Sequence, residues 1–198
     1  MTDSGKLRLF FAFEVRDGVR SLAVDHIDHM RNRIGTREVR WACPDDLHIT
    51  TFFLGDHENV RLHAFVAAGE QAAFEAEPFD FRVGGLGCFP ASVQPRVLWL
   101  GASEPAARPA STLLAHLQSL LPDVPLDHAI YRPHITLGYV RPTANRTAVQ
   151  AALESSPPSV AIEMTVDRLV LMQTIPEDER RKSGSARYNT VQVFPFSM

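Results

Sequence analysis

The tripeptide His-Ile-Thr occurs twice in this chain, and the two copies constrain its fold and chemistry more than any other feature. The first copy lies in the segment 47–55 and the second in 131–138. Both segments are rich in apolar, β-branched and aromatic residues and are flanked by turn formers, so each is predicted to be a strand. Residues two apart share one face of a strand. Each copy therefore presents an imidazole and a hydroxyl together, opposite a buried apolar face.

The two pairs of polar side chains are His48 with Thr50 and His134 with Thr136. An imidazole is a base when neutral and an acid when protonated, and both forms are accessible near pH 7. Two imidazoles across a cleft can move protons on opposite sides of one reacting centre. Threonine hydroxyls can donate to an anionic oxygen or orient the imidazole. This chemistry suits a phosphodiester undergoing in-line displacement. A strained cyclic phosphodiester needs no metal, so no cofactor is expected.

The rest of the chain predicts an α+β fold. Apolar residues at helical spacing predict helices, which cover about 17–34, 58–74, 113–121 and 146–153. Alternating or continuous apolar runs predict further strands, among them 7–15, 79–83, 96–101 and 189–196. Few strands are separated by regular crossover helices, which favours antiparallel pairing. The two His-Ile-Thr strands occupy similar places in the two halves of the chain. We therefore expect one domain over residues 1–198, made of two similar lobes around a central cleft.

Composition indicates the size of the core and the cellular compartment to expect. The chain has 198 residues, 45% of them hydrophobic, which suffices for a substantial core. No apolar run approaches the roughly 18 residues of a membrane span, and the N-terminal residues lack the apolar core of a signal peptide. Only Cys43 and Cys88 occur, so no disulfide framework is implied. We expect a reduced, cytoplasmic protein without a membrane anchor, and a monomer.

The net charge of −3 argues against binding along a nucleic-acid duplex, because such binding rests on neutralising many phosphates. A nucleic-acid substrate is still compatible with this charge if contact is confined to a chain end or to a few nucleotides.

Other polar features have competing interpretations. His26 and His29 are spaced for metal binding on one helix, but solvated histidines are the favoured interpretation because the cysteine or carboxylate pattern of a zinc site does not accompany them. His48 and His134 could ligate a metal, yet no third ligand is evident. A role for Cys43 as a nucleophile has still less support, since nothing visible in the sequence would lower the pKa of its thiol.

Two further segments are expected to be loops or turns, and each has a functional alternative. The glycine-rich segment 84–90 lacks the lysine and helix of a phosphate loop, so a bulge or turn between strands is expected. The charged segment 176–185 is expected to be a solvated loop, with a role facing substrate as the alternative.

Taken with their flanking residues, the two motifs resemble those of the two-histidine (2H) phosphoesterases. The pattern is closest to the RNA 2′,3′-cyclic phosphodiesterases, formerly described as 2′-5′ RNA ligases. The matching segments extend over nearly the whole chain and are 8–12, 39–41, 47–50, 53–55, 89–90, 95–101, 133–138, 169–172 and Tyr188.

The resemblance implies a bilobal α+β fold with pseudo-twofold symmetry, two antiparallel sheets with flanking helices, and both motifs in a central cleft. It implies hydrolysis of RNA or nucleoside 2′,3′-cyclic phosphate ends to 2′-phosphates. In this family pattern His48 matches the proton donor to the leaving 3′ oxygen and His134 matches the base that activates water. Thr50 and Thr136 match the hydroxyls that contact the phosphate. The partners would be RNA ends or small cyclic nucleotides.

The sequence departs from the family pattern beside the second motif. Ala129 stands where an arginine is common, and Arg132 is the nearest candidate to replace it. Tyr131, Phe53 and Trp41 are candidates to stack on a nucleobase, with burial in the core as the alternative for each. Two other activities stay open: 2′-5′ joining of RNA ends by the same groups, and non-catalytic binding of RNA ends or nucleotides.

Overall fold

The computed structural model describes residues 6–90, 94–127, 130–156, 160–177 and 186–197. Its α-helices are α1 (Asp17–Ile34), α2 (Leu62–Phe74), α3 (Pro109–Leu120) and α4 (Arg146–Glu154), with 3₁₀ turns η1 (Pro44–Asp46) and η2 (Asn59–Arg61). Its strands are β1 (Leu7–Glu14), β2 (Val39–Trp41), β3 (His48–His57), β4 (Phe79–Phe89), β5 (Val97–Ser103), β6 (His134–Val140), β7 (Ile162–Val166), β8 (Arg168–Thr174) and β9 (Tyr188–Pro195). In these ranges, no helix is long and apolar enough to cross a membrane.

The described strands form one antiparallel sheet in the order β7-β4-β5-β6-β3-β1-β8-β9, with β2 added to β6. The α+β class predicted from the sequence is confirmed. The two sheets expected are joined into one nine-stranded sheet, because the motif strands β3 and β6 pair with each other at Ile49 and Ile135. This pairing satisfies backbone groups that would otherwise be exposed at two sheet edges.

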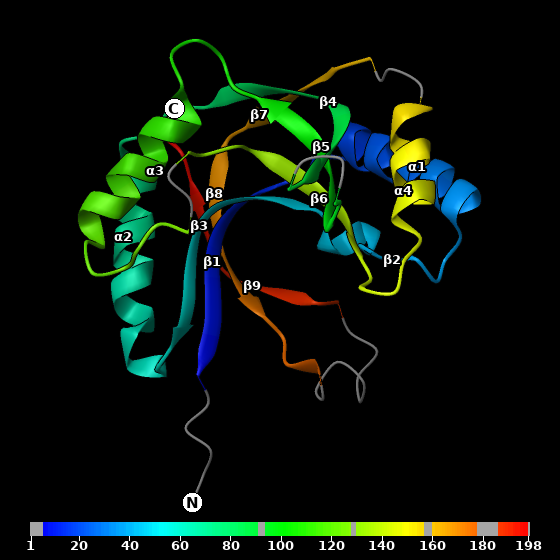
Figure 1. Cartoon of the computed structure of the whole chain (residues 1–198). Helices are drawn as coiled ribbons and strands as arrows, with labels where there is room; N and C mark the ends of the chain where they lie inside the picture. Colours follow the sequence, from blue (N-terminus) through cyan, green and yellow to red (C-terminus); the bar gives the residue numbers. More distant parts are fainter. Residues whose placement is uncertain (1–5, 91–93, 128–129, 157–159, 178–185, 198) are drawn as a thin grey trace, which may run out of the picture.

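The helices cover the two halves of this sheet separately (Figure 1). Helices α2 and α3 pack together beside β3, β8 and β9, whereas α1 and α4 pack together beside β6 and β7. One half of the sheet contains β1, β3, β8 and β9, and the other contains β4 to β7. Each half of the sheet therefore has two helices, but the halves are not the first and second halves of the sequence.

Alternation along the strands separates two apolar clusters. The main core includes Phe11, Phe13 and Phe52, which are fully buried. The opposite face of β1 contributes Phe10 to a small second cluster with residues of β8. Since neighbouring residues of a strand point to opposite faces, β1 supports the helical layer with one face and the cleft described below with the other.

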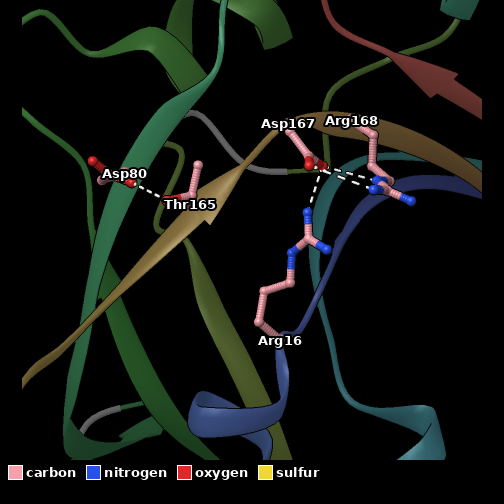
Figure 2. A network of polar contacts seen from close by, with 5 residues as sticks. All are labelled: Arg16, Asp80, Thr165, Asp167 and Arg168. Carbon is pink, nitrogen blue, oxygen red and sulfur yellow. Dashed lines mark hydrogen bonds and ion pairs between the residues drawn. The ribbon is translucent and has the colours of Figure 1, made fainter.

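A carboxylate network fixes the turn between β7 and β8 (Figure 2). Asp167 accepts from the Arg16 guanidinium at 2.6 Å and from Arg168 Nε at 2.8 Å. The hydrogen bond from Arg168 is the main cause that lowers the pKa of Asp167. Arg16 directly precedes α1, so these contacts tie the start of α1 to the sheet. On the neighbouring strands, the Thr165 hydroxyl donates to Asp80 at 2.6 Å and links β7 to β4.

The expectation of a solvated histidine was wrong for His26. Its side chain is buried in α1, because this helix is covered by α4 as well as by β6 and β7. Burial is the main cause that lowers the pKa of His26, and the neighbouring His29 lowers it further. The imidazole is therefore kept neutral as part of the core.

The glycine-rich segment does contain the expected bulge, between Val83 and Leu86. It also continues as strand, because β4 extends to Phe89 in a hairpin with β5. Gly87 permits this close pairing: a Cβ atom there would lie 2.2 Å from the Trp99 ring.

Candidate active site

The paired motif strands bring the four polar side chains to one face of the sheet. Ile49 lies directly opposite Ile135 in the antiparallel pair β3–β6, and both isoleucines are fully buried. The residues on either side of this pair therefore point to the other face, with His48 level with Thr136. By the same geometry Thr50 is level with His134. The two motifs face each other as though related by a twofold axis through the isoleucine pair.

Each motif strand carries a bulge three residues after its histidine. On β6, Thr136 pairs with Trp99 and Tyr139 pairs with Val97, although Trp99 and Val97 are only two residues apart. Paired residues share a face of the sheet, so the extra residue, Leu137, rotates Tyr139 onto the face of the motif.

The equivalent bulge on β3 lies at Thr51. Ala12 pairs with Thr50 and Phe10 pairs with Phe53, so Phe53 joins Thr50 on the same face. Both copies therefore present a histidine, a threonine two residues later and an aromatic ring five residues later.

Backbone carbonyls orient both imidazoles. His48 Nδ1 lies 2.7 Å from the carbonyl oxygen of Asp46, and His134 Nδ1 lies 2.7 Å from that of Arg132. A carbonyl oxygen can only accept, so Nδ1 carries a proton in both rings. The nitrogen that gains and loses a proton is therefore Nε2 in each histidine.

Aromatic rings hold the imidazoles on their other sides. The His48 ring centroid lies 4.9 Å from both Phe10 and Tyr188. The His134 centroid lies 5.0 Å from Phe89 and 6.3 Å from Trp99. These contacts limit rotation of the rings. Each motif, with the carbonyl and the aromatic rings that hold its histidine, forms one half-site, and the two half-sites are similar.

Two cavities with lining residues in common extend from the motifs. The His48 wing, of about 410 Å³, is lined by His48, Arg8, Arg40, Asp46, Arg187 and Tyr188 among others. The His134 wing, of about 750 Å³, is lined by His134, Phe89, Leu126, Asp127, Ile130, Tyr131 and Arg132 among others. Thr50, Phe53, Thr136 and Tyr139 line both wings. The shared wall is thus the place where a group could contact both threonines.

The four residues expected to contact substrate occupy different positions. Trp41 lines the His48 wing and also packs against the main core. Phe53 lies on the shared wall, with the Arg8 guanidinium 4.7 Å from its ring centroid. Arg132 is exposed and lines the His134 wing, two residues before β6 begins. Tyr131 lines the same wing but also packs against the main core. Burial raises the pKa of Tyr131 more than the neighbouring Thr51 hydroxyl lowers it. Ala129 lies outside the described residues.

Sequence reasoning missed three residues of the His48 wing. Tyr139 alternates out of phase with His134 in the sequence, and only the bulge places it in the site. Arg40 and Arg187 come from β2 and from the residue before β9, and both guanidinium groups lie over the Tyr139 ring. The signal in the sequence that could have pointed to Arg187 is its neighbour Tyr188, which matches the family pattern.

The surroundings of His48 favour its neutral form. Burial is the main cause that lowers the pKa of His48, and the charges of His134 and Arg187 lower it further. The Asp46 carbonyl and carboxylate act in the opposite direction without overcoming burial. Since a lowered pKa means that the proton is lost at lower pH, His48 should be mainly neutral at pH 7 in the unliganded protein.

We predict that an NMR titration of the His48 ring gives a midpoint below 6.5. Adding inorganic phosphate should raise this midpoint, because an anion near Nε2 stabilises the imidazolium. The His48→Gln variant assigns the resonance. A midpoint at or above 6.5 without phosphate, or one that phosphate leaves in place, would contradict the electrostatic description of this site.

An antiparallel sheet with two paired His-x-Thr strands at its centre defines the two-histidine class of phosphoesterases. The family model of the 2′-5′ RNA ligase superfamily matches residues 20–177. The chain belongs to this superfamily, which confirms the resemblance noted from its sequence.

Curated relatives give the same grouping. A Thermus thermophilus protein named RNA 2′,3′-cyclic phosphodiesterase is 32% identical over 146 residues, covering 71% of this chain and 72% of the relative. A Geobacillus stearothermophilus protein of the same name is 28% identical over 155 residues, which cover 78% of this chain. The match spans only about half (47%) of that relative's length.

Solved structures agree in fold. A crystal structure of a Thermus thermophilus protein superimposes with a TM-score of 0.74 at 26% identity, covering 96% of this chain and 97% of that chain. Escherichia coli LigT in its apo form gives a TM-score of 0.71 at 23% identity, covering 98% and 100%.

Proposed function

We propose that this protein is an RNA 2′,3′-cyclic phosphodiesterase that opens the cyclic phosphate of an RNA end or nucleoside to a 2′-phosphate. The observation that carries the proposal is the doubled half-site, in which two histidines with the same tautomer stand on one face beside two threonines. Relatives named RNA 2′,3′-cyclic phosphodiesterase support the choice of substrate.

In the proposed reaction the cyclic phosphate lies against Thr50 and Thr136, whose hydroxyls donate to its non-bridging oxygens. His134 Nε2 accepts a proton from water as the water oxygen attacks phosphorus. The bond from phosphorus to the 3′ oxygen breaks, and His48 Nε2 donates a proton to that oxygen. The product carries a 2′-phosphate and a 3′-hydroxyl, and each imidazole is left with the other's starting charge.

The direction of proton transfer rests on the family pattern, because the two imidazoles have equivalent hydrogen bonds. The surroundings of His48 are compatible with the acid role. The causes that lower the pKa of His48 also make its protonated form a stronger acid, and a bound anionic phosphate would help it to gain the proton.

The proposal is tested by incubating the protein with the four nucleoside 2′,3′-cyclic phosphates in EDTA and separating 2′- from 3′-phosphate products. The expected product is the 2′-phosphate alone, formed at a rate that EDTA does not change. Exclusive 3′-phosphate would reverse the assigned leaving oxygen. No turnover despite tight binding would favour a non-catalytic binder instead. Adding RNA with a 5′-hydroxyl end tests joining, since a 5′-hydroxyl that attacks the cyclic phosphate in place of water displaces the 3′ oxygen and leaves a 2′-5′ bond.

The proposed setting is a single domain over residues 1–198, acting as a cytoplasmic monomer. The continuous sheet supports one domain of two lobes. Cys43 and Cys88 are free thiols, as expected in a reducing compartment. A sedimentation mass near 22.0 kDa would agree with a monomer, whereas twice that mass would not.

A further inference from the structure

The two wings differ sharply in charge. Arg8, Arg40 and Arg187 line the His48 wing, and Asp46 is the acidic residue among its described lining residues. Arg8 is paired with Asp56 at 3.1 Å. Arg40 and Arg187 add two further guanidinium groups to the lining of this wing, which has a single described carboxylate, that of Asp46.

These two arginines meet at one aromatic ring. The guanidinium carbon of Arg40 lies 4.8 Å from the Tyr139 ring centroid, and that of Arg187 lies 5.6 Å from it. The Arg187 guanidinium also lies 5.7 Å from the Tyr188 ring. An arginine stacked on a ring keeps its N–H donors directed outward in the guanidinium plane, where they suit a phosphate.

The position of Arg187 is fixed independently of any ligand. Its backbone N–H donates to the Asp46 carboxylate at 2.7 Å, and its carbonyl oxygen accepts from Ile175 at 2.9 Å. Its buried Nε has no hydrogen-bond partner within the described part of the chain, so ring contacts hold the guanidinium. Asp46 also orients His48, which places the arginine beside the catalytic imidazole.

The His134 wing offers the opposite environment. Leu126 and Ile130 expose 37% and 63% of their surface there, next to Phe89. Its charged lining residues, Asp127 and Arg132, are of opposite sign. An apolar wing suits a nucleobase, whereas the arginine-rich wing suits an anion.

We infer that Arg40 and Arg187, stacked on Tyr139, form a subsite for a second phosphate group. This inference rests on the proposed function. The substrate class then consists of cyclic-phosphate ends with another phosphate attached to the same terminal nucleoside, either the preceding phosphodiester of an RNA chain or a 5′-monophosphate. Nucleosides with only the cyclic phosphate would use the catalytic groups but not this subsite.

Four substrates test the subsite: adenosine 2′,3′-cyclic phosphate, its 5′-phosphorylated form, a dinucleotide with a cyclic end, and the same dinucleotide with a neutral methylphosphonate linkage. The wild-type kcat/KM should be about tenfold higher or more for the ordinary dinucleotide than for the methylphosphonate, the size expected for charge-assisted hydrogen bonds. A similar gain for the 5′-phosphorylated nucleoside would mean that any phosphate suffices. A gain confined to the dinucleotide would identify the RNA chain as the source.

The Arg40→Met and Arg187→Met variants should each reduce the ratio of kcat/KM for the ordinary dinucleotide to kcat/KM for the methylphosphonate toward one. Arg187→Lys should retain part of this preference. Arg82→Met is the matched control, because Arg82 is exposed on β4 and lines neither wing. Thermal melting verifies that each variant is folded. A wild-type ratio near one, or a ratio unchanged in both methionine variants, would overturn the subsite and leave the proposed function intact. If the wild-type protein hydrolyses none of the four substrates, the proposed function is overturned instead.

Discussion

Replacing His134 by alanine should lower kcat for a 2′,3′-cyclic phosphate by about 10³-fold, with little change in KM. The variant lacks the group proposed to accept the water proton, and removal of a general acid or base costs about 10²–10⁴-fold. The Nδ1 hydrogen bond of His134 ends on a backbone carbonyl, so its loss disturbs few other side chains. Initial rates under saturating substrate measure the effect.

His48→Ala should cause a similar loss, and the two variants can be told apart by leaving group. With a phosphodiester that releases p-nitrophenolate, the departing oxygen needs no proton. His48→Ala should then recover much of its rate, whereas His134→Ala should not. Recovery in His134→Ala alone would mean that the acid and base are exchanged. Parent rates in either variant would remove the paired-histidine mechanism altogether.

A large loss of stability is expected for Phe11→Ala. Phe11 is fully buried in β1, and its ring centroid lies 6.2 Å from that of Phe194. The space around it is tightly filled, since a Cβ on Gly69 of α2 would lie 3.0 Å from Phe11 and 2.6 Å from Phe194. Removing the ring should lower the free energy of unfolding by about 3–5 kcal/mol, measured by urea denaturation.

Phe74→Ala is the matched control for this loss. Phe74 ends α2 and is 77% exposed, so the same chemical change should alter the free energy of unfolding by about 0.5 kcal/mol or less. Equal losses in the two variants would contradict the assignment of Phe11 to the core between β1 and α2.

The sequence was most informative where its patterns were long or repeated. Six apolar positions at helical spacing predicted α1 over Asp17–Ile34, and the structure confirms those bounds. The doubled His-Ile-Thr predicted two strands with shared faces, and both strands are present. Repetition was decisive because one His-x-Thr on a strand carries little information.

Pairing between distant strands was harder to predict. Strict period-two alternation along β6 would place Tyr139 on the face opposite His134, and the one-residue bulge that reverses this leaves no clear local signal in the sequence. Arg187 reaches the site only because β9 pairs with β8 and because Asp46 binds its backbone. Likewise His26 is buried by contacts of α1 with two separate layers, which its own helical pattern did not reveal.

The backbone anchoring of the two imidazoles has a consequence for how such a site tolerates sequence change. Asp46 and Arg132 hold the imidazoles of His48 and His134 through carbonyl oxygens, which every amino acid possesses. Their side chains can therefore vary without altering the tautomer that the proposed proton transfer requires. Substitutions around the motifs can therefore change the side chains that contact a ligand, while the backbone carbonyls keep both imidazoles in the same tautomer.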